Sequence, residues 1–187
     1  METLEIARSL CYTEFMKYDY VTLYNKHAAF WGATNARKRL LKIGNVCLTW
    51  LFMVCYGGFW VYSLTKKTLE TGDMVKLLFI PLLALLTVSI LRIFIERPRP
   101  YAEEGAGITP MIDKEKADKK SFPSRHLTCA AVISIALLPF YAWMGIGLLA
   151  ASLLLGYTRF ALGLHYPTDL LAGEALGLVF GCLIFIL

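Results

Sequence analysis

Residues 74–95, MVKLLFIPLLALLTVSILRIFI, are the stretch that decides the fold of this chain. Its charged residues, Lys76 and Arg92, lie near its two ends, and the apolar run between them approaches the roughly 20 residues that an α-helix needs to cross a bilayer. Pro81 is compatible with such a helix, because neighbouring helices satisfy the backbone groups that a proline frees inside a membrane bundle. The stretch is therefore predicted to be a transmembrane helix.

The rest of the chain has the composition of a membrane protein. Of its 187 residues 57% are hydrophobic and 18% are charged, which is too apolar for an ordinary soluble domain. Further apolar runs, the middle two of them short, occupy residues 43–64, 127–140, 143–160 and 170–187. In the last run Gly173, Gly177 and Gly181 are spaced four apart, which favours close helix packing. We expect an all-α, multi-pass transmembrane helix bundle with about five spans.

The N-terminal part differs from the remainder. Residues 1–36 mix charges with aromatic side chains and contain no apolar run long enough to span, and a basic group follows at Arg37, Lys38, Arg39 and Lys42. We expect a single domain, 1–187, in which residues 1–42 form an amphipathic interfacial segment and residues 43–187 form the helix bundle. The opening METLEIARSL lacks the basic start and short apolar stretch of a cleaved signal peptide.

The net charge of +5 does not indicate nucleic acid as a partner. The basic residues lie at the ends of apolar runs and in one loop rather than along a continuous stripe, so anionic lipid headgroups are the expected partners. The chain has 5 cysteines, scattered without CxxC spacing, and this pattern predicts neither a disulfide nor a zinc site.

Three polar clusters interrupt the apolar sequence. The first contains Arg92, Arg97 and Arg99, the second is Ser-Phe-Pro-Ser-Arg-His at residues 121–126, and the third covers residues 158–169. Following the predicted spans, each cluster emerges on the same side of the membrane. Polar and ionisable groups at such depths are costly, so we interpret the three clusters as one functional site.

The residue types in these clusters suit an anionic phosphate. Arginine binds phosphate through two parallel hydrogen bonds, and the helix start near Ser124 offers free backbone N–H groups to an anion. Asp169 follows His165 by four residues, a spacing that lets its carboxylate orient one imidazole nitrogen. With His126, the chain has two histidines that can act as a nucleophile and an acid.

Together the clusters resemble the signatures of the type 2 phosphatidic acid phosphatase superfamily, which also includes vanadium haloperoxidases and glucose-6-phosphatases. The family pattern is Lys-x6-Arg-Pro, then Pro-Ser-Gly-His, then Ser-Arg-x5-His-x3-Asp. In this chain the three signatures read Arg92-x6-Arg99-Pro100, Pro123-Ser124-Arg125-His126 and Thr158-Arg159-x5-His165-x3-Asp169. The chain departs from the pattern at Arg92, Arg125 and Thr158, where the family has lysine, glycine and serine. Arg125 is the largest departure, and it leaves the substrate class open.

The resemblance implies a role for each matching residue. His165 attacks phosphorus to form a phosphohistidine, Asp169 holds the imidazole, and His126 protonates the leaving group and then activates water. The phosphate oxygens are held by Arg92, Arg99, Ser124, Arg125 (through its backbone N–H) and Arg159. The resemblance implies no metal and no cofactor.

The implied function is an integral membrane phosphatase in the cell membrane, acting on a phosphomonoester or diphosphate lipid. Undecaprenyl pyrophosphate, phosphatidylglycerophosphate and phosphatidic acid are the candidate substrates, and the motifs do not choose between them. A phosphotransferase using a lipid or sugar hydroxyl as acceptor is an alternative on the same site. A small anion transporter would leave the histidines and Asp169 unexplained, and a soluble haloperoxidase would not be framed by spanning helices. The oligomeric state is left open.

Two further points concern charge. We interpret Arg97 as an interfacial anchor or as a partner of Glu96, and His27 as a surface or interfacial residue. Counting lysines and arginines near the spans places the active-site loop inside the cell, whereas the family resemblance implies an extracytoplasmic site. Catalytic arginines inflate the count, so we favour the extracytoplasmic face.

Overall fold

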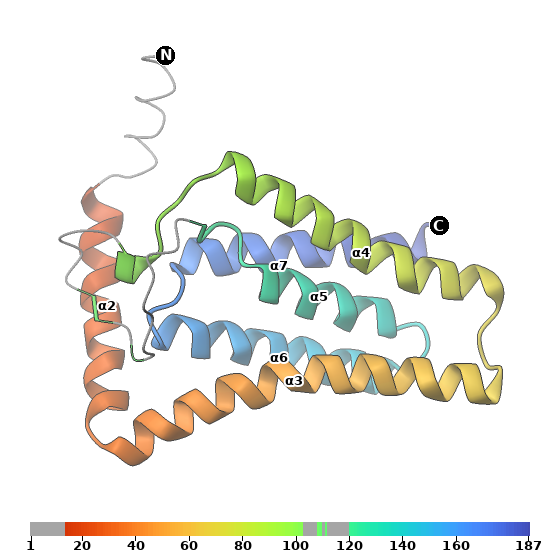
Figure 1. Ribbon diagram of the computed structural model, residues 1–187, viewed down its shortest axis with the longest axis horizontal. Coiled ribbons are helices and arrows are strands. Elements are labelled where there is room, and N and C mark those ends of the chain that lie inside the picture. Colours follow the sequence, from red (N-terminus) through yellow and green to blue (C-terminus); the bar gives the residue numbers. More distant parts are fainter. Residues whose placement is uncertain (1–13, 103–107, 110, 112–119) are drawn as a thin grey trace.

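The computed structural model describes residues 14–102, 108–109, 111 and 120–187, and these contain six α-helices, two short 3-10 helices and no strand. The predicted all-α class is confirmed. The α-helices are α2 (Glu14–Gly32), α3 (Asn35–Lys66), α4 (Thr71–Phe94), α5 (Arg125–Leu137), α6 (Ala142–Ala161) and α7 (Pro167–Cys182). The 3-10 helices are η1 (Pro100–Ala102) and η2 (Leu183–Phe185). Helices α3 to α7 form a bundle, and α2 runs across one end of it (Figure 1).

Four helices are long and apolar enough to cross a membrane: α3, α4, α6, and α7 continued by η2. The expected count of about five spans therefore becomes four within the described residues, because α5 has 13 residues and is shorter than a bilayer is thick. Helix α5 packs against α4, α6 and α7. It is apolar on nearly every side because protein surrounds it, and not because it faces lipid.

The N-terminal boundary also differs from the expected one. Helix α3 begins at Asn35, where the side chain of Thr34 caps it by accepting a hydrogen bond from the backbone N–H of Arg37. The predicted boundary at residue 42 therefore falls inside α3. The basic residues 37–42 lie in the first turns of a spanning helix, and only α2 remains as a separate described helix before the spans.

Helices α5 and α7 are in close contact, as the glycine spacing predicts. A Cβ atom on Gly173 would lie 2.6 Å from the carbonyl oxygen of Ser124, and one on Gly177 would lie 2.5 Å from that of Thr128. Near the other end, Gly181 faces Ile135. This contact fixes the start of α7 beside the start of α5, where the backbone N–H of Ser124 donates to the carbonyl of Asp169.

Polar side chains inside the bundle are paired across helices. Ser152 on α6 contacts the carboxyl group of Glu174 on α7 at 2.5 Å, and Thr158 on α6 contacts the Asn45 side chain on α3 at 3.3 Å. A polar group in hydrocarbon is costly unless it has such a partner. These pairs therefore hold α6, the helix that carries Arg159, to α7 and α3.

Candidate active site

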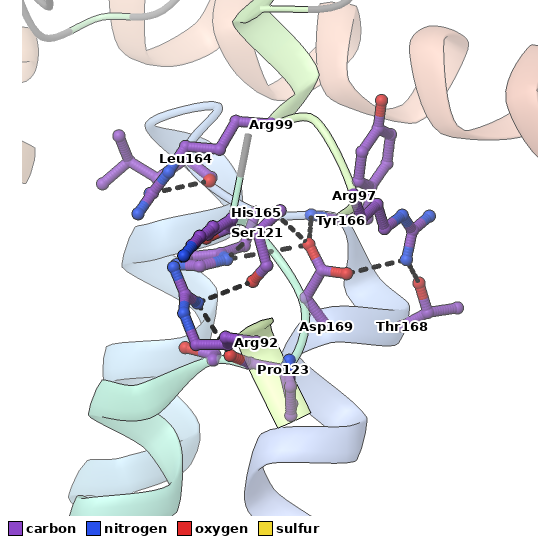
Figure 2. A network of polar contacts seen from close by, with 12 residues as sticks. Arg92, Arg97, Arg99, Ser121, Pro123, Leu164, His165, Tyr166, Thr168 and Asp169 are labelled. Atoms are coloured by element: carbon purple, nitrogen blue, oxygen red, sulfur yellow. Dashed lines mark hydrogen bonds and ion pairs between the residues drawn. The ribbon is translucent and has the colours of Figure 1, made fainter. Parts of the chain in front are cut away.

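The three polar clusters meet at the end of the bundle that α2 crosses. The segment after α4, the loop before α5 and the turn between α6 and α7 all approach one another there (Figures 1 and 2). Each lies at a helix terminus, so its side chains are held by helices that pack along their whole length. The expectation that the clusters form one site is consistent with this arrangement.

His165 and Asp169 are both buried at the centre of this region. The Nδ1 atom of His165 lies 3.6 Å from Oδ2 of Asp169, so the carboxylate faces that nitrogen and not Nε2. Asp169 is itself held, because its Oδ2 accepts a hydrogen bond from the backbone N–H of Tyr166 at 3.0 Å. The predicted orienting pair is therefore present in the geometry.

The electrostatic surroundings keep the imidazole neutral. Burial above all, together with the positive charges of Arg99 and Arg159, lowers the pKa of His165 to about 4, although the contact with Asp169 acts in the opposite direction. A neutral imidazole has a free lone pair for attack on phosphorus. Burial and the nearby arginines therefore favour the neutral form of His165 at neutral pH.

Ser121 is a site residue that the sequence analysis did not assign. Its side chain is buried, its hydroxyl donates to Oδ2 of Asp169 at 2.5 Å, and the same oxygen lies 3.3 Å from Nδ1 of His165. Its place at the start of the second cluster is the one sequence signal that could have identified it. Figure 2 shows Ser121 between the histidine and the carboxylate.

Arg97 lies at the same carboxylate, which corrects its expected pairing with Glu96. Its Nη1 atom is 2.7 Å from Oδ1 of Asp169 and 2.6 Å from the hydroxyl of Thr168, and its guanidinium lies 4.2 Å from the centre of the Tyr166 ring. A buried carboxylate requires compensation by charge or hydrogen bonds. Arg97 supplies it because the extended segment after α4 crosses the start of α7.

Arg92 is buried and faces the backbone of the loop before α5. Its guanidinium donates hydrogen bonds to the carbonyl oxygens of Lys120, Ser121 (3.2 Å) and Pro123 (2.9 Å). These contacts shape the loop that presents Ser121 and Ser124. The expected phosphate contact of Arg92 stays a prediction. In this structure the Arg92 side chain binds the backbone of that loop.

The remaining predicted ligands surround His165. Arg99 donates to the carbonyl of Leu164 at 3.3 Å, next to the histidine, and Arg159 extends from the last turn of α6. Both the hydroxyl of Ser124 and Nε of Arg159 are buried, and within the described part of the chain neither has a hydrogen-bond partner. Buried donors of this kind are normally satisfied, so an anion bound here would complete their hydrogen bonding.

His126 and Arg125 form the exposed side of the site, at the first turn of α5. His126 lies within electrostatic reach of Arg159, His165, Arg125 and Arg99. It is accessible while His165 is buried, which suits a group that exchanges protons with a leaving group and with water.

Comparison with known proteins identifies the family of this chain. Residues 73–187 match the PAP2 superfamily, and this segment contains all three clusters. The chain belongs to the PAP2 superfamily. Helices α2 and α3 lie before the matched segment.

Among curated PAP2 relatives, the chain is 42% identical over 88 residues to an undecaprenyl-diphosphatase, BcrC, of Bacillus subtilis, a match covering 47% of this chain and 44% of the relative. It is 32% identical over 93 residues to a lipid A 4'-phosphatase of Bacteroides thetaiotaomicron, covering 48% and 41% of the two chains. The chain thus spans less than half the length of these two relatives.

The fold is similar to that of a solved structure. The crystal structure of Aquifex aeolicus LpxE superposes with a TM-score of 0.67 at 20% identity, covering 89% of this chain and 94% of that one. At this identity the similarity shows a shared fold, and it extends to helices outside the matched PAP2 segment.

Proposed function

We propose that this chain is a membrane-bound lipid phosphatase that works through a phosphohistidine intermediate. The observation that carries the proposal is the buried His165, oriented by Asp169 and placed beside arginine side chains at one end of a membrane bundle. The functions of the relatives, an undecaprenyl-diphosphatase and a lipid A phosphatase, support a phosphorylated lipid as the substrate class.

The reaction proceeds in two steps. First, Nε2 of His165 forms a bond to phosphorus as the bond to the leaving oxygen breaks, and His126 gives that oxygen a proton. Then His126 removes a proton from water, the water oxygen bonds to phosphorus, and the bond from phosphorus to Nε2 breaks. Inorganic phosphate leaves and both histidines regain their starting states. Asp169 stabilises the positive charge on His165 while the intermediate exists.

Arginines and backbone dipoles stabilise the charge that develops on the phosphoryl oxygens. Arg99 and Arg159 approach from opposite segments, and the buried Ser124 hydroxyl and the N–H of Arg125 lie at the start of α5. Donors fixed before the reaction stabilise a transition state without reorganising. In this proposal guanidinium groups carry out the neutralisation that metal ions perform in other phosphatases.

The test is phosphate release by the purified full chain in lipid vesicles, with undecaprenyl pyrophosphate, phosphatidylglycerophosphate and phosphatidic acid as substrates. We expect release from at least one lipid, unchanged by a chelator and inhibited by vanadate, which imitates the five-coordinate phosphoryl group. Loss of activity with a chelator and recovery with magnesium would contradict the proposed metal-free reaction. Release that depends on an added hydroxyl acceptor would indicate a phosphotransferase instead.

A further inference from the structure

Helix α2 packs on the loop that carries His165, although it lies outside the matched PAP2 segment. Tyr20 and Tyr24, one turn apart, are buried, and both rings pack near the ring of Phe160. Figure 1 shows α2 crossing the end of the bundle where the site lies. The aromatic face of α2, defined by Tyr20 and Tyr24, therefore covers the turn after α6.

Tyr24 restrains this turn two residues before His165. The turn needs Gly163, whose φ is +73°, and a Cβ there would lie 2.9 Å from the Tyr24 hydroxyl. The ring thus sits directly against the backbone of Gly163. Its hydroxyl is anchored on the far side by a 2.7 Å hydrogen bond to the carbonyl of Thr109. Movement of Tyr24 would release the backbone that leads into His165.

Tyr20 reaches the same site by a second route. Its ring lies 4.8 Å from the ring of Tyr166, the residue after His165. The guanidinium of Arg97 lies over the ring of Tyr166 and also contacts Oδ1 of Asp169. A continuous set of contacts therefore runs from α2 to the carboxylate that orients the imidazole.

We propose that α2 is a positioning element for the active site, in which Tyr20 and Tyr24 hold the segment containing His165 in its reactive geometry. The inference rests on the proposed function. A nucleophile on a turn, unlike one within a helix, needs outside support to stay within about 0.5 Å of its productive position. Displacement by about 1 Å is enough to slow a reaction by about a hundredfold. The two tyrosines supply that support from both sides of His165.

A residue of α2 outside the aromatic face provides a matched control. Leu23 lies between the two tyrosines in sequence but is 46% exposed, so its side chain points away from the turn. Leu23→Ala removes apolar volume from the same helix without touching the aromatic face.

The first experiment measures kcat and KM for Tyr20→Ala, Tyr24→Ala, Tyr20→Phe and Leu23→Ala in the full chain, on vesicles with the lipid that the wild-type chain hydrolyses. We expect kcat to fall about tenfold or more in both tyrosine-to-alanine variants, with KM changed less than about twofold, since the phosphate ligands stay in place. Tyr20→Phe keeps the ring and should restore activity, and Leu23→Ala should match the wild type. Folded alanine variants with wild-type kcat, or a loss confined to KM, would overturn the proposal.

Tyr24→Phe removes only the hydroxyl that binds the Thr109 carbonyl. This variant therefore tests whether α2 positions His165 even if the alanine variants do not fold. We expect a several-fold fall in kcat with unchanged KM, and a wild-type kcat would overturn the proposal. The ¹⁵N signals of the His165 imidazole give a readout independent of turnover. The chemical shifts of these signals should change in Tyr24→Phe and stay unchanged in Leu23→Ala. If the wild-type chain hydrolyses no lipid, the proposed function fails, and these signals alone decide whether α2 positions His165.

Discussion

At the scale of single residues, His165 and Asp169 carry the largest expected effects. His165→Ala should abolish phosphate release, because no other group can form the bond to phosphorus. Asp169→Asn should lose most activity but less than His165→Ala, since it removes an orienting partner and not the nucleophile. Phosphate release by each purified variant measures both effects. Leu23→Ala, which changes an exposed side chain on α2, is the control, and substantial turnover by His165→Ala would exclude the phosphohistidine.

The pKa of His165 predicts the acid side of the pH profile. Burial is the main cause that lowers this pKa to about 4, and the nucleophile must be neutral, so protonation of His165 should lower kcat/KM as the pH drops through about 4. An unperturbed histidine would lose activity near pH 6.5. Arg99→Ala removes a positive charge that lowers the pKa and should move this acid limb upward. The measurement is kcat/KM against pH, and an acid limb near 6.5 in the wild-type chain would contradict the electrostatic account.

Arg125 is the residue that predicts substrate preference. It is exposed at the first turn of α5, beside the buried Ser124, where its guanidinium is available to a second phosphate group. Arg125→Gly should lower kcat/KM for an isoprenoid diphosphate about tenfold or more and leave a monophosphate lipid nearly unchanged, because a charge-assisted hydrogen bond contributes about 1.5–3 kcal/mol. Kinetics on the two substrates measure the difference. Equal losses on both would make Arg125 a general phosphate ligand.

At the scale of helices, the contact between α5 and α7 sets the alignment of the site. A Cβ on Gly177 would lie 2.5 Å from the carbonyl oxygen of Thr128, so Gly177→Ala forces the two helices apart. We expect a loss of about 1–3 kcal/mol in stability and a parallel loss of activity. Gly147→Ala on α6 is the matched control, because a Cβ there has no neighbour within 4 Å. Thermal unfolding in detergent compares the two, and equal midpoints would contradict the packing argument.

At the scale of the whole molecule, the bundle places the site and the turn between α3 and α4 at opposite ends (Figure 1). We expect the site to open on the extracytoplasmic face. In a cysteine-free chain, Lys120→Cys should react with an impermeant maleimide on intact cells, and Thr68→Cys should react only after the cells are opened. The reverse pattern would place the site in the cytoplasm, as the count of lysines and arginines suggests.

The helical class, the membrane location and the grouping of the three polar clusters were predictable because their signals are local. An apolar run such as residues 74–95 must satisfy its own backbone in lipid, so it must be a helix. The order of the three clusters along successive antiparallel helices was enough to bring His126, His165 and Asp169 to one end. The four-residue spacing of Gly173, Gly177 and Gly181 likewise predicted the close contact that Gly177 makes with Thr128.

What the sequence determined by itself is therefore the all-α class, the apolar helices and the polar residues at their ends, since these follow from short-range pattern. Only the tertiary structure decided which partner each charged group takes. Arg97 pairs with Asp169, Arg92 binds loop carbonyls and α5 is enclosed by protein, and each of these depends on segments that meet only in the folded bundle. The physical reason is that an arginine can donate hydrogen bonds to a carboxylate, a carbonyl or a phosphate, so packing and not residue type alone makes the choice.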